Sequence, residues 1–139
     1  NARAQSNLGA MYANGEGVPE NNAEAVKWYR LAAEQGYEKA QNKLGAMYSS
    51  GDGVPENYAE ALTWYRAAAE QGNARAQYSL GLMYDSGNGV PENDSVAVKW
   101  YRLAAEQGHA NARYRLKFMD DYGFGVSESD AEVVKSGIQ

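Results

Sequence analysis

The chain has 139 residues, a formal net charge of −5 at pH 7 and no cysteine. The lack of cysteine excludes disulfide frameworks, cysteine-ligated metals and thiol nucleophiles, and the acidic balance argues against a nucleic-acid backbone as the main partner. No apolar run approaches the roughly 18 residues that a membrane-spanning helix requires.

The most informative feature of the sequence is a repeat of 36 residues. Alanine recurs at this spacing, and the string Gly-x-Gly-Val-Pro-Glu-Asn recurs at residues 15–21, 51–57 and 87–93. A period of this size indicates stacked repeats, in which each unit buries its apolar face against its neighbours. We therefore predict one solenoid domain over residues 1–139, with units at about 1–37, 38–73, 74–109 and 110–139.

Each unit is predicted to begin with a helix, as residues 38–50 illustrate. Ala40 and Leu44 fall on one face of that helix, because side chains four residues apart share a face. Gly51 follows at the place where a left-handed C-cap residue is expected. Pro55 then favours an extended segment, since the residue before a proline avoids the helical region.

The second helix of this unit is predicted to begin after Asn57, which resembles a capping box with Glu60 three residues later. Gly72 is expected to end it. Tryptophan and tyrosine are adjacent in the middle of this helix and of its equivalents, and we expect their rings to fill the space between units. These pairs are Trp28–Tyr29, Trp64–Tyr65 and Trp100–Tyr101.

Glycine recurs in the middle of the first helices, at Gly9, Gly45 and Gly81. Glycine inside a helix costs about 1 kcal/mol relative to alanine, so its recurrence needs a packing reason. We predict that another backbone approaches these positions too closely for a β-carbon.

These motifs resemble the Sel-1-like repeat. The chain carries Leu-Gly-x-Met-Tyr at 44–48, Gly-x-Gly-Val-Pro at 51–55 and Ala-x-x-Trp-Tyr-Arg-x-Ala-Ala-Glu-Gln-Gly at 61–72. The resemblance covers essentially the whole chain. It implies an all-α fold, a right-handed α/α superhelical solenoid of about four helix-loop-helix repeats related to tetratricopeptide repeats.

Members of that family generally serve as adaptors that hold partner proteins, in bacterial envelope and host-interaction settings or in eukaryotic quality control. The resemblance therefore implies a protein–protein interaction scaffold that has no catalytic residues and no cofactor. A bacterial periplasm or envelope, or a cytoplasm, is the compartment that the resemblance favours.

The two ends of the array are predicted to differ. In the last unit Lys117 replaces Gly81 and Ser136 replaces Trp100, so this unit is degenerate. Polar replacements suit a terminal repeat, whose outer face meets water. The first unit, by contrast, is as regular as the interior ones at Leu8. We therefore expect either upstream repeats in a longer parent protein or self-association of this chain through its N-terminal edge.

Comparison of the units with one another separates fixed positions from varying ones. The varying positions of the first helices have offsets of 0, 4, 7 and 11, which place them on one helical face. By resemblance to tetratricopeptide folds, the first helices line the concave side of the superhelix, so this variable stripe and the tyrosines beside it are the candidate partner-binding surface. The candidate residues are Arg3, Asn7, Lys39, Lys43, Arg75, Tyr78, Ser79, Leu82, Tyr114, Arg115, Phe118 and Tyr122.

The variable stripe is basic although the chain is acidic, and it becomes aromatic and apolar towards the C-terminus. An acidic peptide with an apolar anchor would suit such a surface. Two simpler explanations remain open. One is that Arg75 only pairs with Glu70, and the other is that the final helix covers Tyr114 and Phe118.

Two other functions suit a repeat protein of the cell envelope. One is a glycan- or peptidoglycan-binding module, for which the tyrosines near the C-terminus offer a stacking surface. The other is a hydrolase of β-lactam-like substrates, but such a serine enzyme requires Ser-x-x-Lys, which the sequence lacks. The Gly-x-Gly loops follow a helix and predict turns rather than a phosphate site. His109 is interpreted as a loop residue.

Overall fold

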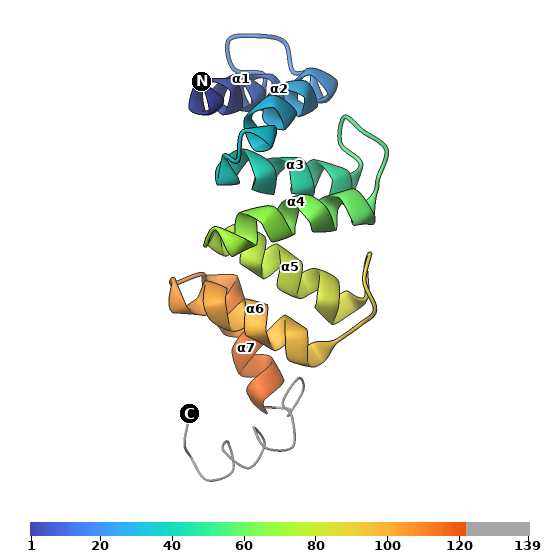
Figure 1. The fold of residues 1–139 in the computed structure, drawn as a ribbon, viewed down its shortest axis with the longest axis vertical. Coiled ribbons are helices and arrows are strands. Elements are labelled where there is room, and N and C mark those ends of the chain that lie inside the picture. The colour runs from blue at the N-terminus through green and yellow to red at the C-terminus, as the bar shows by residue number, and fades with distance from the viewer. Residues whose placement is uncertain (122–139) are drawn as a thin grey trace.

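The computed structural model describes residues 1–121, and this part of the chain consists of seven helices with no strand. The helices of the first three units pair as α1 with α2, α3 with α4 and α5 with α6, and the pairs stack along one axis from the N-terminal end to α7 (Figure 1). The chain therefore has the all-α repeat architecture that its period predicts. The helices are α1 (Ala2–Asn14), α2 (Asn22–Glu34), α3 (Glu38–Ser50), α4 (Tyr58–Glu70), α5 (Ala74–Ser86), α6 (Asp94–Glu106) and α7 (Ala110–Asp121).

In each of the first three units a glycine ends the first helix and an asparagine caps the second, on either side of the long loop. The Asn57 side chain accepts a hydrogen bond from the Glu60 backbone N–H at 3.1 Å and so caps α4. The predicted capping box is only half formed, because the Asn57 backbone N–H donates to the Tyr48 carbonyl at 2.9 Å instead. Gly51 ends α3 with φ 76°, a left-handed conformation that glycine adopts without strain.

The mid-helix glycines make room for a tyrosine ring. A β-carbon at Gly45 would lie 2.8 Å from Cδ1 of Tyr65, and one at Gly81 would lie 2.6 Å from Cδ1 of Tyr101. The prediction of a close approach is confirmed, but the prediction that a backbone makes it is wrong. At Gly81 the nearest backbone atom, the Ala97 carbonyl oxygen, is farther away at 3.3 Å. In each of the first three units the second helix contacts the first through this ring.

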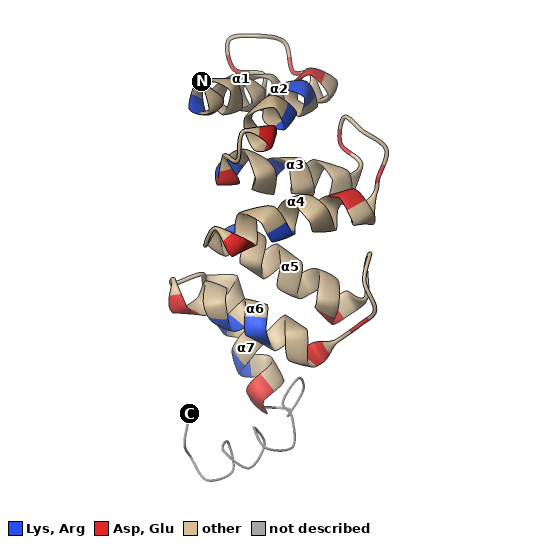
Figure 2. Cartoon of the chain, viewed as in Figure 1, with Lys and Arg blue, Asp and Glu red and all other residues tan. Residues whose placement is uncertain are grey.

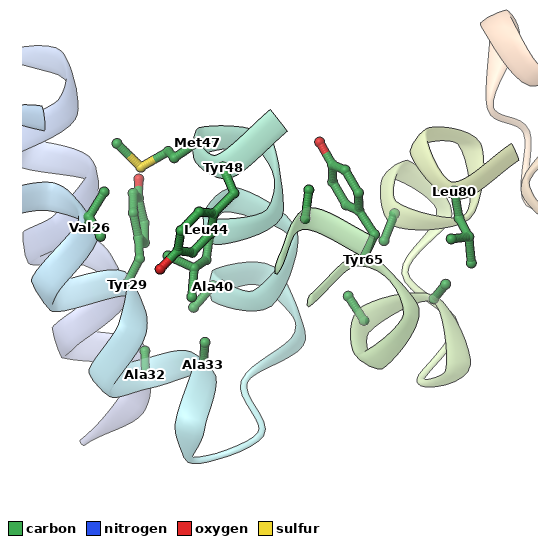
Figure 3. Close-up of a cluster of buried hydrophobic side chains, with 14 of the residues drawn as sticks. Val26, Tyr29, Ala32, Ala33, Ala40, Leu44, Met47, Tyr48, Tyr65 and Leu80 are labelled. Carbon is green, nitrogen blue, oxygen red and sulfur yellow. The ribbon is translucent and has the colours of Figure 1, made fainter. Parts of the chain in front are cut away.

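The core consists of thin apolar layers between helices. Side chains of Ala40, Leu44 and Met47 on α3 face those of Tyr29 and Ala33 on α2, and these five side chains are buried (Figure 3). Alanine at so many of these positions lets the helix backbones approach closely. The tyrosines of the three Trp–Tyr pairs are buried as predicted, whereas the tryptophans are half-buried.

A set of glutamine hydrogen bonds, here called the glutamine joint, links consecutive units. Gln41 Nε2 donates to the Ala33 carbonyl at 3.2 Å, and Gln71 Nε2 donates to Gln41 Oε1 at 2.8 Å and to the Gly36 carbonyl at 3.0 Å. The next unit repeats all three bonds through Gln77 and Gln107. Each such bond is worth about 1 kcal/mol, and its loss leaves a buried group unsatisfied.

The first unit exposes a face that the interior units bury. Ala40 and Leu44 are fully buried, whereas Ala4 is exposed and Leu8 is half-buried. Met11 is 37 % exposed although its equivalent in α3 is buried. Both forms of the expectation for this edge, upstream repeats or self-association, stay predictions. The second half of the predicted fourth unit lies outside the described residues.

Candidate binding groove

The variable stripe lies along the first helix of each unit, on α1, α3, α5 and α7. Its residues differ in exposure, which reflects how far each one also belongs to the core. Arg3, Asn7, Lys39, Lys43, Arg75, Tyr114, Arg115 and Phe118 are exposed, Tyr78, Ser79 and Leu82 are half-buried, and Tyr122 lies outside the described residues.

Three hollows of one kind form a row along this stripe. The first lies between α1 and α3 and has a volume of about 380 Å³, the second lies between α3 and α5 with about 200 Å³, and the third lies between α5 and α7 with about 190 Å³. Every residue that lines the second or third hollow is one or two repeat lengths after a residue that lines the first. We call this row the groove.

The groove has a constant floor and changing walls. Met47, Met83 and Met119 occupy the same place in the three hollows. One wall position grows in apolar size from Ala46 through Leu82 to Phe118, and another carries Lys43, Ser79 and Arg115 in turn. The three hollows therefore share equivalent lining positions, whereas the size and charge of the side chains in their walls differ from one hollow to the next.

Tyr29 and Tyr65 line the first and second hollows, and their equivalent Tyr101 reaches the third through Asp85, which lines it. Tyr101 Oη donates to Asp85 Oδ2 at 2.9 Å. Burial, and then the adjacent Asp85 carboxylate, raise the pKa of Tyr101 far above its ordinary value. Burial also raises the pKa of Tyr65, whose hydroxyl bonds with Ser79 and Ser49 oppose the shift. Tyr65 and Tyr101 are therefore neutral hydrogen-bonding groups across the physiological pH range.

The third hollow is electrostatically mixed. Arg115 Nη1 lies 3.8 Å from Asp85 Oδ2, and the acidic side chains of Glu92 and Asp94 also line this hollow. Arg115, one of the basic residues of the stripe, is therefore a paired charge. Asp85 was missed as a groove residue. The signal was available, because Ala13 and Ser49 stand at its position in the other units.

A fourth hollow, the basic hollow, has a volume of about 400 Å³ and lies between the first helical turns of α3 and α5. No acidic side chain lines it. The ion pairs within residues 1–121 are Lys27–Glu24 and Arg115–Asp85, so the structure contains no pair between Arg75 and Glu70. The residues that line the basic hollow are Lys39, Asn42, Lys43, Asn73, Ala74 and Arg75.

His109 and Tyr78 have a structural role that the sequence did not indicate. His109 Nδ1 accepts a hydrogen bond from the Ala112 backbone N–H at 3.2 Å, and its ring stacks on Tyr78 with 4.6 Å between centroids. Burial, followed by the charge of Arg75, lowers the pKa of His109. Tyr78 thus belongs partly to the packing between α5 and α7, whereas Tyr114 is 73 % exposed.

Acidic residues lie both in the long loops and on the helices (Figure 2). Within the part of the chain that the structure describes, no three histidine or acidic side chains are grouped so that they could hold a metal ion. None of the helices of residues 1–121 is both long and apolar enough to cross a membrane.

Stacked helix pairs with a groove along one face define an α/α repeat scaffold, a fold that typically mediates protein–protein interactions. The chain belongs to the Sel1 repeat family, whose model matches residues 2–37, 38–73 and 74–109. The Sel1 repeat is a non-catalytic scaffold fold, and no related enzyme is indicated. A search of curated proteins finds no match.

Three solved structures with the same fold come from bacteria. A protective antigen of uropathogenic Escherichia coli, c5321, has a TM-score of 0.89 and 43 % identity over 96 % of this chain. A Sel1 repeat protein from Oxalobacter formigenes has a TM-score of 0.86 and 42 % identity over 92 % of this chain. This chain spans 29 % and 53 % of those two proteins. Helicobacter pylori cysteine rich protein B shares the fold, with a TM-score of 0.70 and 22 % identity over 83 % of this chain and 89 % of its own.

Proposed function

We propose that the protein is an interaction scaffold that holds an extended segment of a partner protein in the groove, on the concave face of the superhelix. The observation that supports this most strongly is the row of three equivalent hollows with a constant floor. An extended segment presents side chains at regular intervals, so it can place them in successive hollows. Differences between the walls then select which side chain each hollow accepts.

The apolar anchor of such a segment belongs in the third hollow. Phe118 and Met119 form its apolar lining, and Leu82 contributes to the hollow before it. Buried apolar anchors dominate the affinity of most peptide complexes, because they remove the largest apolar area from water. We therefore expect bound peptides to share a large apolar residue near one end.

Selection from a random peptide library displayed on phage tests the proposal. Selected peptides are labelled, and their dissociation constants are measured by fluorescence anisotropy with the wild-type chain and with the double variant Phe118→Ala/Arg115→Ala. We expect the double variant to bind at least about tenfold more weakly, as hot-spot truncations do. The far-ultraviolet circular dichroism spectrum should not change.

The matched control is Leu103→Ala/Arg102→Ala. Leu103 is 43 % exposed and Phe118 is 46 % exposed, and the Leu103–Arg102 pair lies on α6, outside the groove. This control should alter the dissociation constants less than twofold. Equal losses in both double variants, or no selected peptide at all, contradict the proposal. Soluble peptidoglycan fragments are measured in parallel, and their binding in place of peptides would favour the glycan-binding alternative.

A further inference from the structure

We infer that the basic hollow is a subsite for a run of acidic side chains in the partner segment. This inference rests on the proposed function and names the chemistry of one part of the ligand. The lining of the basic hollow consists of Lys39, Lys43, Arg75, two asparagines and Ala74. The side chains that line it therefore present three positive charges and no carboxylate.

The three charges are gathered around one hollow whose lining includes no acidic side chain, and the nearby Glu38 carboxylate accepts a hydrogen bond from Asn73. The formal net charge of the chain is −5, and the two ion pairs within residues 1–121, Lys27–Glu24 and Arg115–Asp85, both lie outside this hollow. Lys39, Lys43 and Arg75 are exposed, and none forms an ion pair with a described acid. Like charges placed around one hollow repel one another, and a negatively charged ligand relieves that repulsion.

Of the two asparagines, Asn73 contributes little that would favour another ligand. Asn73 is already occupied, because its side chain accepts from the Ala76 backbone N–H at 2.8 Å and donates to Glu38. Recognition in the basic hollow is therefore dominated by charge rather than by a fixed set of neutral hydrogen bonds.

The arrangement favours several side-chain carboxylates over a single chain terminus. Lys39 and Lys43 are one helical turn apart on α3, and Arg75 lies on α5 across the hollow. One terminal carboxylate carries a single charge and cannot neutralise three cations on two helices. Adjacent acidic residues in an extended segment point to opposite sides, so a short run can meet both helices.

The basic hollow also connects to the groove. Lys43 lines both the basic hollow and the first groove hollow. A segment whose apolar anchor occupies the third hollow can therefore continue along the groove and end with its acidic residues at α3 and α5. The inference thus specifies which part of the groove the apolar residue occupies and where the acidic residues lie, which the proposed function alone does not.

The experiment uses two labelled peptides of twelve residues, one with four consecutive glutamates near one end and a phenylalanine near the other, and one with glutamines in place of the glutamates. The dissociation constant of each peptide is measured by fluorescence anisotropy with the wild-type chain and with Lys39→Gln/Lys43→Gln/Arg75→Gln, here called the hollow variant. The matched control is Lys27→Gln/Lys99→Gln/Arg102→Gln, which removes three exposed cations from the second helices and lowers the net charge equally.

We expect the glutamate peptide to bind the hollow variant about thirtyfold more weakly than the wild type, since each exposed ion pair accounts for up to about fivefold in affinity. The control variant should lose less than threefold. Raising the salt concentration should weaken binding to the wild type and have little effect on the hollow variant, because salt screens exposed charges.

The opposite results overturn the inference. It fails if both triple variants lose affinity equally, if the glutamine peptide binds as tightly as the glutamate peptide, or if amidation of the C-terminus abolishes binding. Tighter binding of a labelled single-stranded oligonucleotide than of the glutamate peptide also overturns it. If selected peptides still bind the groove and depend on Phe118 while the hollow variant binds them normally, the proposed function stands and only this inference falls.

Discussion

The contact between the mid-helix glycines and the tyrosine rings gives the sharpest stability prediction, for Gly81→Ala. In an exposed helix this substitution stabilises by about 1 kcal/mol through helix propensity. Here the new β-carbon would lie 2.6 Å from both Cδ1 and Cε1 of Tyr101, a residue with no exposed surface. The ring is also held by its hydroxyl bond to Asp85, so it cannot move aside freely.

Overpacking of a rigid core costs about 1–3 kcal/mol, and this close contact falls at the upper end of that range. After subtraction of the propensity gain, we expect Gly81→Ala to lower the free energy of unfolding by about 2 kcal/mol. Gly45→Ala and Gly9→Ala should cost less, because their β-carbons would lie 2.8 Å and 2.9 Å from the nearest ring atom. Urea unfolding followed by circular dichroism at 222 nm measures all three.

Two controls isolate the ring contact from helix propensity. Ala46→Gly, at an exposed position of α3, should cost about 1 kcal/mol and calibrates the propensity effect in this chain. In a Tyr101→Ala background, Gly81→Ala should reverse its sign and become stabilising, because the obstacle is gone. If Gly81→Ala destabilises the chain by the same amount with and without Tyr101, steric conflict with the ring is not the cause.

Three further predictions concern protonation and the glutamine joint. Lowering the pH from 7 to 5 should destabilise the chain slightly, because the folded state depresses the pKa of His109 and the unfolded state therefore binds more protons below about pH 6.5. His109→Asn, which matches Asn73 in the preceding unit, should remove that dependence in pH-resolved thermal melts. Above about pH 10 Tyr101 loses its proton in the unfolded state but keeps it in the folded state, so the free energy of unfolding should fall as the pH rises. Tyr101→Phe should make this dependence on pH less steep, and an equally steep dependence in the variant would refute the role of Tyr101. Gln77→Leu should cost about 2 kcal/mol in urea unfolding, because it removes the bonds to Ala69 and Gln107, whereas Gln35→Leu at the exposed first unit should cost less than half as much.

Most of the fold could be predicted because the same helix-forming and turn-forming motifs recur in successive repeats of the sequence. The period located the helices, and the boundaries predicted for the first helix of the second unit, 38–50, are those observed. Asn57 and Gly51 identified their helix ends through local hydrogen bonding and backbone preference, which depend on a few neighbouring residues. Local rules of this kind do not require knowledge of the tertiary contacts.

The groove could be predicted only in part. The variable stripe lies on the helix face where the hollows open, but which side chains meet across units depends on how the helices stack. The Asp85–Arg115 pair joins α5 to α7, and the Tyr78–His109 stack joins α5 to the start of α7. Comparison of equivalent positions would have identified Asp85, whereas nothing in the sequence distinguishes the ring contact at Gly81 from a backbone contact.

The glutamine joint has a practical consequence for anyone who rebuilds this protein. Both of its complete copies use the same atoms at nearly the same distances, so the surface that leaves one unit is the surface that the next one accepts. A duplicate of residues 38–73 spliced in after position 73 would meet native partners on both sides. The array could thus be lengthened one module at a time, and its length would become an adjustable parameter.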